Sequence, residues 1–217
     1  MAENLVKDQL YFFFDQTRCM GCQTCVVACK DWQQLKPGRA KLRNLHDAES
    51  GTWPNMQAFI SVYSCNHCDS PKCMNACPTE AIFKDEKTGI VYVDENICQG
   101  VGDCIAACPY KAPQIPDDFQ EPKDENILQD TVMEGHKMRK CDMCWDRVTS
   151  GEGLQPACVA SCLARALDWG TYDYLMKKYP DAKSARDTVL MAYNHEDTAS
   201  KMETKPNFLF RAKPKKF

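Results

Sequence analysis

The cysteines of this chain constrain its fold more than any other feature. There are 15 of them in 217 residues, and they fall into four groups. The groups read Cys19-x2-Cys22-x2-Cys25-x3-Cys29, Cys65-x2-Cys68-x4-Cys73-x3-Cys77, Cys98-x5-Cys104-x3-Cys108 and Cys141-x2-Cys144-x13-Cys158-x3-Cys162. An odd count does not fit a framework made only of disulfides, and cysteines two residues apart on a tight loop bridge poorly. A chain of this length can also bury an apolar core without cross-links. The pattern therefore indicates metal ligands.

The spacing within the groups is typical of iron–sulfur clusters. A Cys-x2-Cys-x2-Cys loop can give three thiolates to one cubane. The cysteine three residues later lies on the next helical turn and ligates the other cluster of a pair, as in two-cluster ferredoxins. The prolines that follow Cys77 and Cys108 belong to the same pattern. Four groups predict two ferredoxin-like pairs and up to four clusters.

Structural zinc is the main alternative for part of the pattern. Zinc needs paired Cys-x2-Cys knuckles and four ligands. Only the last group, Cys141 and Cys144 with Cys158 and Cys162, fits that requirement by itself.

The third group lacks one cysteine. Val101 stands where the second cysteine of the loop is expected, and Cys98 and Cys104 keep their register on either side. Valine cannot bind iron, so the pattern predicts a [3Fe–4S] cluster there. The open alternatives are a fourth ligand from solvent or from Asp103, and an empty site.

Apolar runs and charge give the coarse organisation. Strands are expected at 10–14, 58–63, 90–93 and 166–169, and helices at 26–34 and 172–179. The formal net charge of −3 gives no reason to expect nucleic-acid binding. The first residues lack the basic and apolar regions of a signal peptide, and no apolar stretch is long enough to span a membrane. We therefore expect neither a signal peptide nor a span.

Several local strings resemble a known family. They are Cys65-Asn66-His67-Cys68, Ala107-Cys108-Pro109-Tyr110 and Lys140-Cys141-Asp142-Met143-Cys144, together with the order of the four groups. Over residues 10 to 180 the chain resembles the iron–sulfur (beta) subunit of molybdopterin oxidoreductases, of the dimethyl sulfoxide reductase B subunit type.

The resemblance implies how the cysteines pair. The first and fourth groups would hold two [4Fe–4S] clusters, one on Cys19, Cys22, Cys25 and Cys162, and one on Cys141, Cys144, Cys158 and Cys29. The second and third groups would hold a [4Fe–4S] cluster on Cys65, Cys68, Cys73 and Cys108, and a cluster on Cys77, Cys98 and Cys104. The nitrate reductase branch of the family has a tryptophan at the position of Val101 and a [3Fe–4S] centre there, which favours [3Fe–4S] over a fourth [4Fe–4S] cluster.

The implied fold is α+β, with two ferredoxin-like two-cluster modules related as a pseudo-repeat, inserted loops and an extended C-terminal tail. Residues 1–57 together with 139–180 would form the first module and residues 58–112 the second. Residues 113–138 would be an acidic inserted loop, and residues 181–217 a tail that contacts a partner.

The implied function is that of a non-catalytic electron-transfer subunit. It would relay electrons between a quinol, membrane or soluble donor and a catalytic subunit that carries molybdopterin with molybdenum or tungsten, in an anaerobic respiratory type of oxidoreductase. In some complexes of the family a membrane-anchor subunit takes part. The protein would then be membrane-associated through its partners, on the cytoplasmic side or exported with the catalytic subunit. A stand-alone polyferredoxin and a zinc-bound scaffold are the alternatives.

Residues beside the cysteines suggest how such clusters are tuned. Cations next to a cluster raise its reduction potential. The candidates adjoining cysteines are Lys30, Lys111, Arg139, Lys140 and Arg147, and the alternative for each is a solvated surface charge. His67 lies inside a ligand loop, where it either supports the cluster ligands or contacts a partner, or is an ordinary polar residue.

Overall fold

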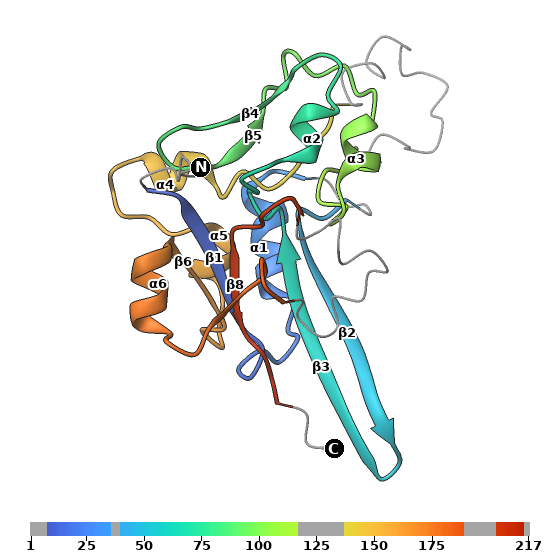
Figure 1. Ribbon diagram of the computed structural model, residues 1–217, viewed down its shortest axis with the longest axis vertical. Coiled ribbons are helices and arrows are strands. Elements are labelled where there is room, and N and C mark those ends of the chain that lie inside the picture. Colours follow the sequence, from blue (N-terminus) through green and yellow to red (C-terminus); the bar gives the residue numbers. More distant parts are fainter. Residues whose placement is uncertain (1–7, 36–39, 117–136, 189–202, 215–217) are drawn as a thin grey trace.

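A computed structural model describes residues 8–35, 40–116, 137–188 and 203–214 (Figure 1). Its largest sheet has four strands in the order β6-β1-β8-β7. These strands are β6 (Leu167–Thr171), β1 (Leu10–Asp15), β8 (Phe208–Arg211) and β7 (Lys183–Ser184). β1 is antiparallel to β6, with Phe12 opposite Trp169, and parallel to β8, with Phe12 opposite Phe208.

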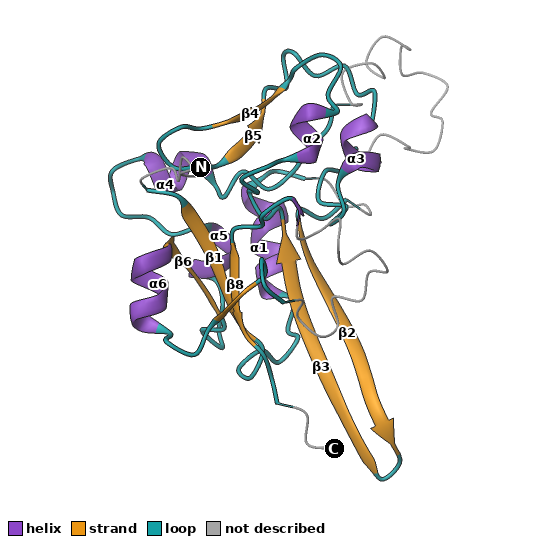
Figure 2. Cartoon of the chain, in the orientation of Figure 1, coloured by secondary structure: helices purple, strands orange, loops and turns teal. Residues whose placement is uncertain are grey.

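Two hairpins and six short helices complete the described fold. The hairpins are β2 (Arg43–Thr52) with β3 (Asn55–Ser64), and β4 (Ile82–Lys84) with β5 (Val91–Val93). The helices are α1 (Thr24–Trp32), α2 (Lys72–Asn75), α3 (Asp103–Ala107), α4 (Trp145–Thr149), α5 (Ala157–Ala160) and α6 (Tyr172–Lys178). β4, β5, α2 and α3 gather at one end of the molecule, and the β2–β3 hairpin runs from beside α1 toward the opposite end (Figures 1 and 2).

β1 organises the core because its apolar residues alternate between two faces. Phe12 and Phe14 pack among the cysteines, whereas Tyr11 and Phe13 pack against α6. Successive side chains of a strand point to opposite faces, so an almost continuous aromatic run indicates a strand covered on both sides. The sheet thereby separates the cysteine loops from α6.

The structure confirms the strands and helices expected from the sequence, and its architecture is a mixture of α and β elements. β1, β3, β5 and β6 occupy or overlap the four expected strand ranges, and α1 and α6 the two expected helix ranges. β2, β4, β7 and β8 are additional to the expected strands, and the four shortest helices contain or follow cysteines. Among the described residues, no helix is long and apolar enough to cross a membrane.

The expected module boundaries cut through elements that the structure joins. The boundary between residues 57 and 58 falls inside β3, which is paired with β2 along its full length. One core cluster also contains cysteines from both expected modules, for example Cys25 and Cys65. The residues assigned to the two expected modules therefore share a hydrophobic core.

The C-terminal tail differs from its expectation. β8 lies inside the main sheet, and Phe208, Leu209 and Phe210 are buried. Its backbone hydrogen bonds go to β1, almost two hundred positions earlier, and a four-residue strand carries little local signal.

Most of the acidic insert, residues 117–136, lies outside the described residues. Its ends are close, because Gln114 and Arg139 exchange backbone hydrogen bonds of 2.9 and 2.7 Å.

Candidate metal centres

The four cysteine groups share one backbone feature. In each Cys-x-x-Cys or Cys-x-x-Val loop, the residue before the second ligand position has a positive φ: 74° at Gly21, 44° at His67, 71° at Gly100 and 59° at Met143. Residues other than glycine rarely adopt this backbone conformation. Turns of this kind direct successive N–H groups toward one concave side, as in anion and iron–sulfur sites. The loops therefore have the same local form although their sequences differ.

The cysteines of these loops line three hollows. The first is lined by Cys19, Cys22, Cys25 and Cys162. The second is lined by Cys65, Cys68, Cys73 and Cys108. The third is lined by Cys77, Cys98 and Cys104. The structure thus brings together cysteines from different groups in the three sets implied by the resemblance.

The remaining four cysteines face one another in the interior. Burial raises the pKa of Cys29 to about 12, and the nearby Cys158 and Cys144 add to that rise. Burial also raises the pKa of Cys141 well above its ordinary value, again with Cys29 and Cys158 nearby. Buried thiols of this kind need a bound cation before they are stable as thiolates. Their chemistry therefore suits a metal centre.

This fourth set bears on the zinc alternative. The zinc alternative requires Cys141, Cys144, Cys158 and Cys162 together, but Cys162 lines the first hollow with Cys19. Cys29 takes its place beside the other three. Within the described part of the chain, no three His, Cys, Asp or Glu side chains are arranged to hold a single metal ion.

Helical spacing places neighbouring sets side by side. Cys25 and Cys29 lie four residues apart on α1, so their side chains emerge on the same helix face about 5–6 Å apart. Cys25 belongs to the first hollow and Cys29 to the interior set. The two sets are therefore close neighbours along one face of α1.

The chain also repeats a turn after the last cysteine of two groups. The amide of Ala81 donates to Cys77 Sγ over 3.3 Å, and that of Ala166 donates to Cys162 Sγ over 3.2 Å. Glu80 and Arg165, the residues just before these amides, both have a φ of 52°. N–H···S bonds of this kind help to set the potential of a bound cluster.

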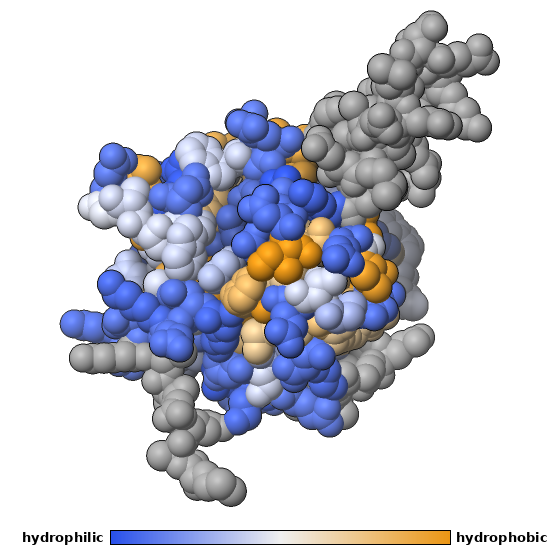
Figure 3. Space-filling model, turned by 90° about the horizontal axis from the view of Figure 1, so that it is seen from above, coloured by the Kyte–Doolittle hydropathy of each residue, from blue (hydrophilic) through white to orange (hydrophobic). Residues whose placement is uncertain are grey.

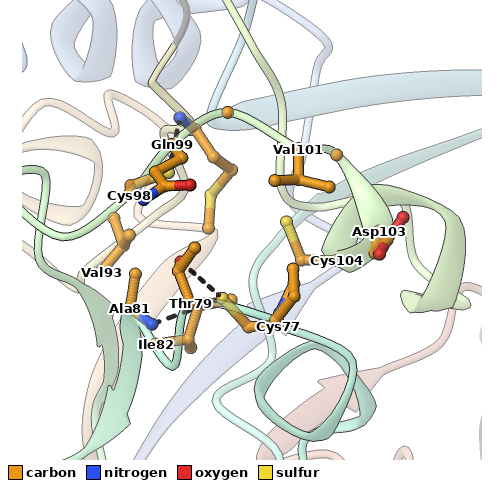
Figure 4. Close-up of a pocket in the computed structure, with 14 residues that line it drawn as sticks. Cys77, Thr79, Ala81, Ile82, Val93, Cys98, Gln99, Val101, Asp103 and Cys104 are labelled. Carbon is orange, nitrogen blue, oxygen red and sulfur yellow. Dashed lines mark hydrogen bonds between the residues drawn. The ribbon is translucent and has the colours of Figure 1, made fainter.

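The third hollow shows what Val101 replaces. Gly100 and Gly102 have φ values of 71° and 93°, and Gly21 and Gln23 on either side of Cys22 have 74° and 61°. Val101 is therefore at the backbone position of Cys22. It lies over the hollow near Cys98 and Cys104, while the carboxylate of Asp103 points away from their sulfurs (Figure 4). Val101 is 57% exposed, so this hollow opens to the surface.

His67 anchors its loop to two distant segments. It is fully buried, and Nδ1 accepts a hydrogen bond of 3.0 Å from the amide of Val91. Its carbonyl accepts from Asn207 Nδ2 over 2.6 Å. Burial and the nearby Lys140 hold the pKa of His67 well below its ordinary value, so the ring is neutral. Its clearest role is to fix the loop in place.

The cations expected beside the cysteines differ in what they contact. Lys30 donates to a backbone carbonyl, Arg139 pairs with Glu95, and Arg147 stacks on Trp32. Lys140 alone among the five is buried with its ammonium near a cysteine sulfur.

Viewed from the end that carries α2 and α3, the visible surface is largely hydrophilic around a small apolar area (Figure 3).

Two contributors to the sites were missed at the sequence level. Arg43, the first residue of β2, is buried and donates to Cys158 Sγ over 3.1 Å. Thr204 lines the second hollow. Burial raises the pKa of Cys68, and a hydrogen bond from the Thr204 side chain partly offsets that rise. Neither residue is near a cysteine in the sequence, so no local signal could have revealed it.

Thr204 belongs to a C-terminal segment that runs beside the second cysteine loop. The amides of Asp69 and Ser70 donate to the carbonyls of Lys205 and Thr204 over 3.0 and 3.1 Å. The carboxylate of Asp69 also pairs with Arg186 over 2.7 Å. Although burial would raise the pKa of Asp69, hydrogen bonds from side chains around it keep that pKa below 3.8.

The chain is similar to known proteins. The 4Fe-4S dicluster domain family matches residues 56–124 and 125–172. The B subunit of anaerobic dimethyl sulfoxide reductase from Escherichia coli K12 is 42% identical over 181 residues, which cover 80% of this chain and 78% of that protein. The B subunit of the same name from Haemophilus influenzae is 39% identical over 79% of this chain and 78% of its own length. Protein NrfC of Escherichia coli K12 is 33% identical over 73% of this chain and 64% of its own length.

Identity of this extent over most of both proteins, together with cysteine loops of one backbone form, does not arise from cysteine content alone. The iron–sulfur and electron-transfer character expected from the sequence is thereby established. The protein belongs to the 4Fe-4S dicluster family and is an iron–sulfur subunit of the dimethyl sulfoxide reductase B subunit type.

Proposed function

We propose that this protein is an electron-transfer subunit that carries four iron–sulfur clusters, three [4Fe–4S] and one [3Fe–4S]. The observation that carries the proposal is the grouping of the cysteines. The fifteen cysteine side chains form three sets of four and one set of three. Beside the set of three, Val101 stands at the backbone position that Cys22 has in the first set. Each cysteine is assigned as a ligand of the set in which it lies.

The donor sets fit the proposed groups. Each set offers three or four thiols, and most of them are buried. A bound cluster supplies a one-electron redox centre at each site. The protein holds the thiolates in place, directs amide N–H groups to cysteine sulfurs at Cys77 and Cys162, and excludes water from the interior set. None of these roles requires a catalytic residue on this chain.

The proposed partner is a catalytic subunit that contains molybdopterin with molybdenum or tungsten. Similarity to a protein named as the B subunit of an anaerobic dimethyl sulfoxide reductase, and to a probable second one, supports this partnership. A membrane-anchor subunit in the same complex, and a position at the membrane reached through these partners, complete the proposal. The substrate belongs to the catalytic subunit, and nothing in this chain selects it.

Electron paramagnetic resonance of anaerobically purified protein tests the cluster assignment. The oxidised protein is expected to show a near-isotropic signal of roughly one spin per chain from a [3Fe–4S] centre. In Val101→Cys that signal should disappear, and the iron content should rise, because a fourth thiolate is restored. Val101→Ala is the matched control and should keep the signal, since it alters the side chain without adding a ligand.

The outcomes separate the parts of the proposal. An oxidised wild-type protein without the signal, but with iron for four complete cubanes, would contradict the [3Fe–4S] assignment and leave the four sites intact. A colourless protein that contains zinc would refute the function. Size-exclusion chromatography after mild affinity purification tests the partnership. A subunit elutes with a much larger catalytic chain, whereas a stand-alone polyferredoxin elutes as a monomer.

A further inference from the structure

Arg43 is a buried cation with no acidic partner among the residues that the structure describes. Its side chain is 1% exposed, and its guanidinium stacks over the ring of Phe12 at 4.4 Å. Its one hydrogen bond among the described residues goes from Nη2 to Cys158 Sγ, and Nε and Nη1 have none. No Asp or Glu of the described chain forms an ion pair with it. A buried charge without a counter-charge is strongly unfavourable, so something else must compensate this guanidinium.

Arg43 lies beside cysteines of two different sets. It donates to Cys158 of the interior set, and Phe12, over which its guanidinium stacks, belongs to the same core cluster as Cys25 of the first hollow. Burial alone would lower the pKa of Arg43, but negative charge on Cys158, Cys141, Cys25 and Cys29 raises it above its ordinary value. Cys25 belongs to the first hollow, and the other three belong to the interior set. The guanidinium therefore lies between two of the proposed clusters.

Lys140 is a second buried cation that lies between two of the cysteine sets. It is 4% exposed, and Nζ lies 3.7 Å from Cys65 Sγ in the second hollow. The same ammonium donates to the carbonyl of Cys141 over 2.9 Å and to the carbonyl of Val91. Cys141 belongs to the interior set, so Lys140 lies between that set and the second hollow. Neutral carbonyls and a cysteine sulfur are its contacts within the described structure.

We infer that Arg43 and Lys140 are tuning cations. Each raises the reduction potential of the two clusters beside it and so assists electron transfer between them. This inference rests on the proposed function. Reduction adds a negative charge to a cluster, and a buried positive charge a few ångströms away favours the reduced form. The cluster of the interior set lies beside both cations, whereas the [3Fe–4S] centre at Val101 lies beside neither.

Redox titration followed by electron paramagnetic resonance tests the inference. Arg43→Gln should lower the equilibrium constant for reduction at least tenfold, or about 59 mV for one electron, at two [4Fe–4S] clusters. Lys140→Gln should do the same at two clusters, one of which is shared with Arg43→Gln. The [3Fe–4S] centre at Val101 should keep its potential in both variants and serves as an internal reference.

Two further variants separate charge from structure. Lys177→Gln removes an exposed charge from α6 and should leave every potential unchanged. Arg43→Lys keeps the charge and should stay close to the wild-type potentials. If Arg43→Gln does not retain its clusters, cluster content in Arg43→Lys decides: wild-type content supports a need for charge, and loss as in Arg43→Gln overturns the inference.

Other results would also overturn it. These are unchanged potentials in Arg43→Gln, equal shifts of all four centres, or equal shifts in Arg43→Gln and Arg43→Lys. Iron analysis of the wild-type protein comes first. Absence of four clusters there refutes the proposed function, whereas four clusters with unaffected potentials in the variants refute only the role of the two cations.

Discussion

Leu209 tests whether the C-terminal segment is part of the fold or a tail that needs a partner. It is fully buried in β8 and packs with Tyr11, Phe13 and Leu175 on the face of the sheet covered by α6. Replacement of a core leucine by alanine removes apolar contact and leaves a cavity, at a cost of about 2–5 kcal/mol. For a chain of this length, a loss of about 3 kcal/mol lowers Tm by roughly 9 °C.

The assay is anaerobic heating of the isolated, cluster-loaded chain, followed by the loss of its visible absorption and of its tertiary circular dichroism. Leu163→Ala is the matched control, because Leu163 is 74% exposed and its truncation is expected to change stability by less than about 0.5 kcal/mol. Leu209→Ala should melt well below both the control and the wild type. If Leu209→Ala and Leu163→Ala melt together, β8 is not part of the folded chain and the described packing is refuted.

Three other predictions follow from the site and the hairpin. Cys22→Val should create a second [3Fe–4S] centre, since Cys22 and Val101 share a backbone position, so the oxidised spin signal roughly doubles; an unchanged signal would contradict that equivalence. Asp69→Asn should lower Tm. Because the pKa of Asp69 is below 3.8 in the folded chain, its contribution is present above that value and is lost as the pH falls through the lowered pKa. The Tm difference from wild type should therefore be constant from pH 8 to about pH 5, and a difference that shrinks within that range would refute the assignment. Gly51→Ala should destabilise more than Gly151→Ala: both glycines have a positive φ, which costs alanine about 1 kcal/mol, but only at Gly51 would a Cβ meet backbone. Equal Tm shifts would argue against the hairpin turn.

Local pattern predicted the parts of the fold that short-range physics controls. The aromatic run at 10–14 is a strand because it alternates between two packed faces, and 172–178 is a helix closed by Pro180. The ligand loops could be recognised because the geometry of a cluster fixes the spacing of three cysteines along one short segment. The same logic identified Val101 as the odd position of the third group.

Pairing between segments could not be read in this way. β8 has four residues, and its neighbours β1 and β7 lie far from it in sequence. The shared core and the β2–β3 hairpin likewise join ranges that the resemblance to the family assigned to separate modules. These contacts depend on which surfaces remain to be buried after the local elements form, and a short segment does not carry that information.

The amino-acid sequence by itself determined which chemistry to expect, because its cysteines have the spacing of iron–sulfur ligands and Val101 stands where one more cysteine is expected. The tertiary structure decided the surroundings of those cysteines. Arg43 reaches Cys158 across 115 positions of the chain, and Thr204 reaches the second hollow from the C-terminal segment. The physical reason is range: ligand spacing is set by bonds along a loop, whereas burial and charge at a cluster are set by whichever distant residues the fold packs around it.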